Sequence, residues 1–96
     1  MLTAKQKQYL KSTAVAFPAV VQIGKDGITD NVINSVTEAL NARELIKVKV
    51  NQNSDEDIHK AAGLLSEESD SEVVQIIGRN CILFKQKDKK SHYELL

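Results

Sequence analysis

The segment Gly24–Gly27, with the sequence Gly-Lys-Asp-Gly, has the residue types and the spacing to hold an anion. It follows an apolar segment, residues 20–23, that we expect to be a strand, and it precedes an amphipathic helix expected to begin near Thr29. Glycine permits close approach of a ligand to the backbone, and the first turn of a helix adds unpaired N–H groups and a partial positive charge. Phosphate is the natural ligand of such a junction. A tight strand-to-helix turn also favours glycine, so the pattern alone is equally compatible with a structural role.

Groups that could perform catalysis are few. The two histidines, His59 and His92, have no nucleophile or metal-ligand partner evident in the sequence. Three consecutive acids, residues 55–57, lie at the expected start of a helix, where the helix dipole already explains them. The glycine segment also lacks the G-x-x-x-x-G-K-S/T pattern of nucleotide-hydrolysing loops. We therefore expect no enzyme activity, no metal site and no other cofactor.

Composition indicates one folded domain, because the chain has 96 residues, of which 42% are hydrophobic and 27% are charged. No apolar run approaches the roughly 18 residues of a membrane span, and the first residues do not resemble a signal peptide. We therefore expect a cytoplasmic protein without a membrane partner. Cys81 is the single cysteine and is followed by apolar residues, so we expect a packed thiol and no internal disulfide.

Charge is unevenly distributed along a chain whose net charge is zero. Residues 1–50 carry seven Lys or Arg against four Asp or Glu, and residues 79–96 carry five against two. Residues 51–78 carry seven acids and a single basic residue, Lys60. If folding brings the two basic segments together, a neutral protein acquires one positive and one negative surface. A nucleic-acid partner is therefore compatible with the zero net charge, although a solvated acidic helix without function would give the same distribution.

Hydrophobic periodicity predicts three helices and four strands in the order α-β-α-β-α-β-β. The strand-helix-strand units favour parallel pairing and the closing hairpin adds an antiparallel pair, so we expect a two-layer α/β fold with a mixed four-stranded sheet. The polar residues 85–96 are expected to form a partly mobile tail. The first expected helix covers residues 3–16, the second begins near residue 29 and the third covers residues 54–66. The expected strands cover residues 20–23, 45–50, 73–77 and 81–84.

Local patterns add detail to these elements. The segment 45–50 alternates, so its apolar residues should face a core whereas Lys47 and Lys49 should face away from it. Ser54 and Asp57 form a variant of the capping box at the start of the third helix. Residues 78–80, Gly-Arg-Asn, are expected to be the turn of the closing hairpin.

Four blocks of residues, in order and spread over nearly the whole chain, form a pattern far more specific than the glycine segment. They are Leu2-Thr3-x-Lys5-Gln6-Lys7, Ile23-Gly24-Lys25-x-Gly27-Ile28, Ala39-Leu40 followed by Arg43-Glu44-Leu45-Ile46-Lys47-Val48, and Val73-Val74-Gln75-x-Ile77-Gly78. The pattern resembles the bacterial YhbY-like proteins, which are single-copy versions of the CRM domain of chloroplast RNA splicing and ribosome maturation factors. The resemblance implies RNA binding and a mixed four-stranded sheet packed with helices, similar to the C-terminal domain of bacterial translation initiation factor three. Bacterial members are associated with precursors of the large ribosomal subunit, and plant relatives bind introns.

The resemblance also implies an RNA-backbone clamp formed by Gly24, Lys25 and Gly27. The charge pattern adds further expected RNA contacts, namely Lys5, Lys7, Lys11, Lys47, Lys49 and Arg79. The chain has no tryptophan and no aromatic residue that is evidently an exposed stacking platform. We therefore expect recognition of RNA shape and phosphate rather than of unstacked bases.

Three departures from the family pattern predict weaker RNA binding than that of a basic relative. Val15 replaces a histidine common in relatives, Asp70 lies where relatives are often basic, and the net charge is zero. Asp26, inside the clamp, also repels phosphate. Because phosphate contacts dominate affinity, each of these differences should weaken binding.

The expected partner is ribosomal RNA in a precursor of the large subunit, bound by a monomer, with a contact to a ribosomal protein as a further expectation. The alternative is a protein-binding adaptor, whose acidic third helix docks on a basic ribosomal protein or assembly factor. The zero net charge slightly favours this alternative.

Overall fold

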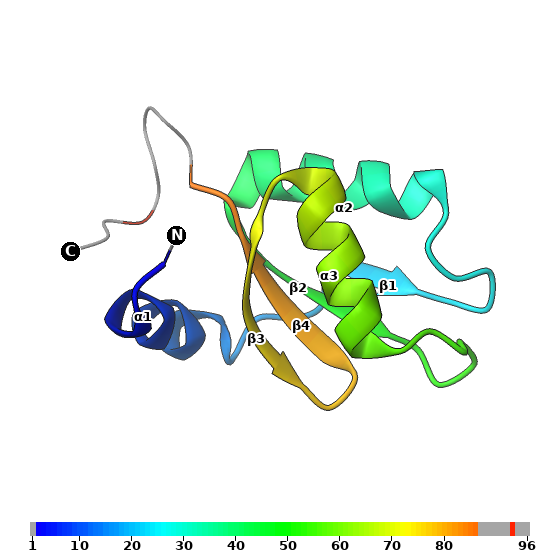
Figure 1. Ribbon diagram of the computed structural model, residues 1–96, viewed down its shortest axis with the longest axis horizontal. Helices are drawn as coiled ribbons and strands as arrows, with labels where there is room; N and C mark the ends of the chain where they lie inside the picture. The colour runs from blue at the N-terminus through cyan, green and yellow to red at the C-terminus, as the bar shows by residue number, and fades with distance from the viewer. Residues whose placement is uncertain (1, 87–92, 94–96) are drawn as a thin grey trace.

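The computed structural model describes residues 2–86 and residue 93. This part of the chain contains three helices and four strands in the expected order (Figure 1). None of these helices is both long and apolar enough to cross a bilayer. The helices are α1 (Ala4–Ala14), α2 (Asp30–Arg43) and α3 (Ile58–Ser69), and the strands are β1 (Val21–Ile23), β2 (Leu45–Val50), β3 (Glu72–Ile77) and β4 (Asn80–Phe84).

The four strands form one mixed sheet in the order β1-β2-β4-β3. β1 is parallel to β2, and β4 is antiparallel to both β2 and β3. Helix α2 connects the two parallel strands, since a parallel pair requires a long crossover. The fold class and the mixed sheet expected from the sequence are confirmed.

The hairpin turn is shorter than expected. Asn80 already pairs with Ile77, so the turn is Gly78-Arg79 rather than residues 78–80. Gly78 has a φ of 57°, and Arg79 does not share this positive φ. A glycine at the first position of a two-residue turn is typical of tight hairpins, because it adopts this backbone conformation without steric cost.

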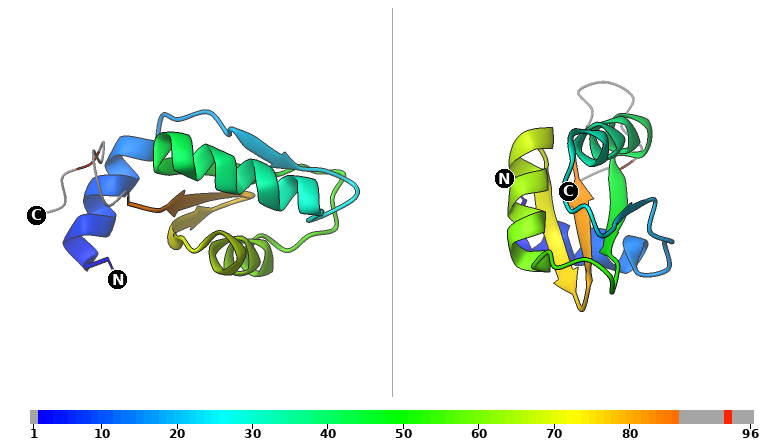
Figure 2. Two further views of the ribbon diagram at one scale, coloured as in Figure 1. Left: turned by 90° about the horizontal axis from the view of Figure 1, so that it is seen from above. Right: turned by 90° about the vertical axis from the view of Figure 1, so that its right-hand side faces the viewer.

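Apolar residues gather on both faces of the sheet. On one face, α2 and α3 cover the larger core, which includes Ile23, Val48 and Leu83. On the other face, α1 covers a smaller core that includes Leu10 and Leu45. Helix α1 lies at one end of the long axis (Figure 1, Figure 2). The helices α2 and α3 form a full layer on one face, and α1 adds a partial third layer to the two layers expected from the sequence, which leaves part of the second face without a helix.

The caps explain where the first two helices begin. At α1, the Thr3 hydroxyl accepts from the Gln6 amide at 3.1 Å, and the Gln6 side chain accepts from the Thr3 amide at 2.9 Å. At α2, the hydroxyl of Thr29 accepts from the amide of Val32 at 3.3 Å, as predicted. Such reciprocal or single caps satisfy N–H groups that have no partner within the helix.

The predicted cap of α3 is wrong. Asp57 caps the helix, because its Oδ1 accepts from the His59 amide at 2.8 Å. Ser54 is buried in the preceding loop, where its hydroxyl accepts from the Glu56 amide at 3.2 Å. The helix also runs to Ser69 instead of Ser66, and Asp70 ends it with a positive φ of 55°.

Part of the polar tail contributes to the smaller core. The Tyr93 ring packs edge-on against Phe84, with ring centroids 5.8 Å apart. The Gln86 side chain donates to the Tyr93 carbonyl at 3.1 Å. Of the tail predicted over residues 85–96, the structure describes residues 85, 86 and 93. The other residues of the predicted tail, 87–92 and 94–96, lie outside the described residues.

Candidate nucleic-acid interface

The segment Gly24–Gly27 forms a tight turn at the end of β1. The Gly27 amide donates to the Gly24 carbonyl at 3.1 Å. This hydrogen bond closes the turn and leaves Lys25 and Asp26 exposed at its tip. The turn therefore presents one cation and one anion to solvent, with the backbone of its tip beside them.

The start of α2 is less open to an anion than the sequence suggests. The Thr29 cap already accepts from the Val32 amide, and Asp30 places an acid in the first turn. Both groups compensate the positive end of the helix dipole. A phosphate at this junction would therefore depend mainly on Lys25 and on the amides of the turn tip.

The two glycines of the turn differ in what the fold requires of them. Gly27 has a φ of +73°, and a Cβ atom built there would lie 2.5 Å from the Oε1 atom of Glu56. Gly24 has no positive φ, and a Cβ atom there would meet nothing within 4 Å. The fold explains the second glycine, whereas the first glycine has no structural explanation.

The loop between β2 and α3, residues 51–57, lies against the turn. The Asn51 amide donates to the Ile23 carbonyl at 2.9 Å, and the half-buried Glu56 side chain reaches Gly27. No local pattern in the sequence brings residue 56 beside residue 27. The carboxylate of Glu56 therefore adjoins the expected phosphate clamp. The sequence did not predict this contact.

Arg79 holds this same loop in place. Its guanidinium donates to the carbonyl oxygens of Val50 at 2.9 Å, Asn51 at 2.7 Å and Ser54 at 3.3 Å. The Val50 amide in turn donates to the Arg79 carbonyl at 2.8 Å. These bonds give Arg79 a structural role that the sequence did not predict, and its contact with RNA stays a prediction.

Lys47 and Lys49 lie on the sheet face that α1 partly covers, since the apolar residues of β2 on either side of them face the larger core, as predicted. Lys49 is exposed. Lys47 is half-buried, and its ammonium donates to the carbonyl of Val15, directly after α1, at 3.1 Å. This bond ties α1 to β2 and uses one of the three donors of the ammonium group.

The expected RNA-binding residues do not form one cluster. Helix α1, which carries Lys5, Lys7 and Lys11, lies at one end of the molecule, and the turn with Lys25 lies at the other (Figure 1, Figure 2). The long axis measures 39 Å. On the sheet, Lys47 lies beside the end of α1, and Lys49 lies near the turn, opposite Gln22 of β1. The arrangement is therefore two separated groups of lysines at opposite ends of the molecule, and the group at the turn adjoins the acids Asp26 and Glu56.

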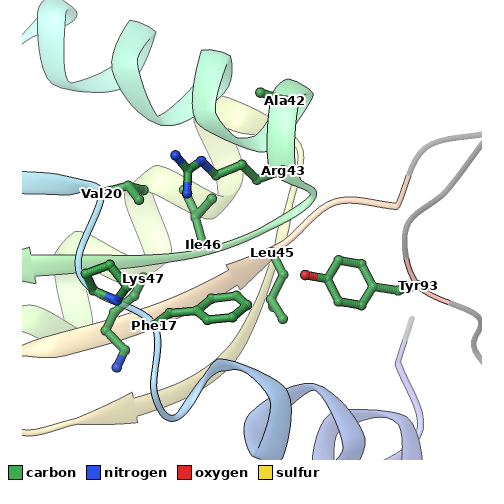
Figure 3. Close-up of a pocket in the computed structure, with 9 residues that line it drawn as sticks. Phe17, Val20, Ala42, Arg43, Leu45, Ile46, Lys47 and Tyr93 are labelled. Atoms are coloured by element: carbon green, nitrogen blue, oxygen red, sulfur yellow. The ribbon is translucent and has the colours of Figure 1, made fainter.

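A cavity of about 400 Å³ lies at the end of the sheet remote from the turn. Figure 3 shows Phe17 and Tyr93 beside Leu45, with the Tyr93 hydroxyl directed toward the leucine. Arg43 and Lys47 contribute the cationic groups of the lining. Burial raises the pKa of Tyr93, and the negative charge of Glu44 raises it further. The lining provides cations and a phenol but neither a carboxylate nor an imidazole as general base.

Metal and thiol chemistry find no support in the described residues. Among residues 2–86 and 93, no group of three His, Cys, Asp or Glu side chains could hold a metal ion. Cys81 is buried, and burial raises the pKa of its thiol to about 11. The prediction of a packed thiol is confirmed.

Comparisons with known proteins agree with this architecture. The family model of the CRS1/YhbY (CRM) domain matches residues 2–85. The chain is 45% identical to the probable RNA-binding protein YqeI of Bacillus subtilis over 99% of both chains, and 35% identical to an RNA-binding protein of Haemophilus influenzae over 92% of this chain and 89% of that one. A solution structure of a Staphylococcus aureus protein, described as a candidate RNA-binding protein, is similar with a TM-score of 0.84, 43% identity and complete coverage of both chains. The chain therefore belongs to the CRS1/YhbY (CRM) domain family.

Proposed function

We propose that the protein binds RNA without catalysing a reaction, and that it acts as a cytoplasmic monomer on ribosomal RNA in precursors of the large subunit. Family membership and relatives that are named RNA-binding proteins support RNA as the ligand. The exposed lysines on the turn, on the sheet and on α1 support contacts with phosphate. The ribosomal target rests on the resemblance to YhbY-like proteins.

The observation that carries the proposal is a glycine at position 24 that the fold does not require. Nothing in the fold requires glycine there, because the position has no positive φ and open space around it. An RNA backbone that approaches the turn closely would require the absence of a side chain. The exposed ammonium of Lys25, the next residue, would then hold a phosphate beside the amides of the turn tip.

Equilibrium binding to fragments of large-subunit ribosomal RNA across a salt series tests this function. We expect Lys25→Glu to weaken binding and to make the salt dependence shallower by about 0.7–0.9 in log–log slope for each lost phosphate contact. Gly24→Ala should weaken binding without changing the unfolding midpoint. The matched control is Lys60→Glu, which makes the same charge change on α3. The proposal fails if the wild-type protein binds no RNA at low salt, or if the control variant weakens binding as much as Lys25→Glu.

A second candidate function, the protein-binding adaptor, is favoured by the end of α3. Glu67 and Glu68 lie in the last turn, where the helix dipole disfavours acids and where no basic residue compensates. Leu64, on the same side of the helix, is 41% exposed. An exposed leucine beside acids at an unfavourable position would suit a basic protein partner.

Charge reversal separates the two functions. Glu67→Lys combined with Glu68→Lys should abolish association with pre-ribosomal particles if α3 is the docking surface. If this variant associates normally while Lys25→Glu does not, the adaptor function is excluded. Glu56 is unsuitable for this test, because it adjoins the Gly24–Gly27 turn.

A further inference from the structure

The sheet face that carries α1 is left open at the end near the Gly24–Gly27 turn. There the strand register aligns one residue from each strand in a row across the sheet. We call this row the open strip. It consists of Gln22 on β1, Lys49 on β2, Asn80 on β4 and Ile77 on β3.

The residues of the open strip face away from the larger core. Their neighbours along each strand, such as Ile23, Val48 and Cys81, lie in the core under α2 and α3, and successive residues of a strand point to opposite faces. Gln22, Lys49 and Ile77 are exposed and Asn80 is half-buried. Helix α1 packs on the other end of this face, over Leu45 and Phe84, so it does not cover the strip.

Apart from the apolar Ile77 on β3, the open strip is polar, cationic and free of acids. An ammonium group, Lys49, lies between two carboxamides, Gln22 and Asn80, in the row. Adjacent strands are about 4.8 Å apart, so the two carboxamide-bearing residues are separated by about 10 Å across the sheet. The strip contains no aromatic side chain on which an unpaired base could stack. Its groups can therefore bind phosphate and form hydrogen bonds, but they cannot sandwich bases.

We propose that the open strip binds the sugar edge of an RNA duplex, with Lys49 at a phosphate and the carboxamides of Gln22 and Asn80 at ribose 2′-hydroxyl groups. A carboxamide both donates and accepts hydrogen bonds, as does a 2′-hydroxyl. The minor groove of duplex RNA is wide and shallow and displays these hydroxyls, which suits a strip without protruding aromatic side chains. The inference rests on the proposed RNA binding and specifies how the protein distinguishes RNA from DNA.

The position of the strip supports its use together with the turn. β1 runs from Gln22 through Ile23 directly into Gly24, so the strip and the turn lie side by side. One duplex could therefore contact Lys25 and the strip at the same time. In that arrangement Lys25 would contribute charge-dependent affinity that RNA and DNA share, and the two carboxamides would contribute the preference for RNA.

Binding of RNA and DNA duplexes of identical sequence tests this inference. The variant combines Gln22→Ala with Asn80→Ala, and the matched control combines Asn31→Ala with Asn34→Ala, which removes two exposed amides from α2. We expect the strip variant to lose about tenfold in RNA affinity, as two ordinary hydrogen bonds would give. Its DNA affinity, its salt slope and the behaviour of the control should stay unchanged. An equal loss for both duplexes, or no loss for RNA, would overturn the inference.

A measurement on the unmodified protein keeps the inference testable if the double variant is unstable. Replacing the 2′-hydroxyls of the RNA duplex with 2′-O-methyl groups should lower its affinity for the wild-type protein, and unchanged affinity would overturn the inference. Lys25→Glu separates this inference from the proposed function. If Lys25→Glu weakens RNA binding while the strip variant keeps the wild-type preference for RNA, the proposed function stands and the strip inference is wrong. If the wild-type protein binds neither duplex, both are wrong.

Discussion

At the scale of single residues, Gly24 and Gly27 give opposite predictions although they occupy matching places in the turn. Gly27→Ala would place a side chain at a φ of +73° and against the Glu56 carboxylate. We expect this variant to lose about 1–2 kcal/mol of unfolding free energy, and Gly24→Ala to change it by less than about 0.5 kcal/mol. Urea denaturation measures both effects. Equal unfolding midpoints for the two variants would contradict the argument.

The carboxylate of Glu56 predicts that RNA binding can be strengthened. It adjoins Gly27 and therefore repels a phosphate held by the turn. Glu56→Gln keeps the shape and removes the charge, so we expect about two- to fivefold tighter RNA binding at low salt, which corresponds to the usual range for partly exposed charges. The gain should shrink as salt rises. Glu67→Gln, on α3, serves as the control and should leave the affinity unchanged. An equal gain from both variants would indicate a nonspecific effect of net charge.

Cys81 predicts a pH dependence of stability. Burial raises the pKa of its thiol from 9.0 to about 11, so between these values the unfolded chain loses the proton while the folded protein keeps it. The unfolded state then binds fewer protons, and the unfolding free energy falls as pH rises through this range. Between pH 9 and pH 11, the unfolding free energy of the wild-type protein should fall by about 2 kcal/mol more than that of Cys81→Ala. Urea denaturation of both proteins at several pH values provides the measurement, and a constant difference between them would contradict the argument.

At the scale of secondary-structure elements, Arg79 connects the hairpin to the loop before α3. Its guanidinium donates to three carbonyl groups of that region. Arg79→Ala should therefore lower the unfolding free energy by about 1–2 kcal/mol, in the range of hydrogen bonds from a charged group that is partly exposed. Arg79→Lys should recover little of this loss, because an ammonium group cannot reproduce the planar fork.

Unfolding and RNA binding measured on the same variants distinguish the two roles of Arg79. A structural residue affects stability first, whereas an RNA-binding residue weakens binding at unchanged stability. Normal stability of Arg79→Ala would therefore contradict the structural role.

The elements were predictable where short-range signals determine them. The cap at Thr29, the alternation in β2 and the glycine of the hairpin all act within a few residues, so the sequence reveals them. The start of α3 was predicted incorrectly, because Ser54 and Asp57 are both good capping residues and the loop contacts decide between them. Propensity alone cannot resolve two candidates that are only three residues apart.

Long-range features of the site were not predictable. Glu44 would pass for a surface residue, yet it is 0% exposed and has a φ of 66° at the end of α2. The contact of Glu56 with Gly27 and the alignment of Gln22 with Asn80 through Lys49 depend on strand order and register. Neither can be obtained from composition or periodicity. Lys25 was found from the glycine segment and the family resemblance and the other basic residues from the charge pattern, but their separation along the molecule required the fold.

At the scale of the whole molecule, the separation between the lysines of α1 and the turn that carries Lys25 predicts how salt affects binding. Lys5 and Lys7 lie on α1, far from the turn that carries Lys25 (Figure 1). If RNA contacts both ends, Lys5→Gln with Lys7→Gln should reduce the log–log salt slope by about 0.7–0.9 for each lost phosphate contact. The loss should add to that of Lys25→Glu, since distant sites are independent. An unchanged slope for the α1 variant would restrict the interface to the turn and the sheet.

The 39 Å distance along the molecule also gives it the character of a bivalent ligand. If RNA binds as proposed, each end is a weak module, and the rigid sheet between them sets the effective concentration at which the second end meets RNA that the first end already holds. An RNA too short to reach both ends would bind with the affinity of one module, and affinity would rise steeply once its length suffices. The same arrangement would also govern release of the bound RNA. Displacing the RNA from either end would return the other to its weak affinity, so a neutral protein could hold a folding RNA firmly and leave when that RNA changes shape.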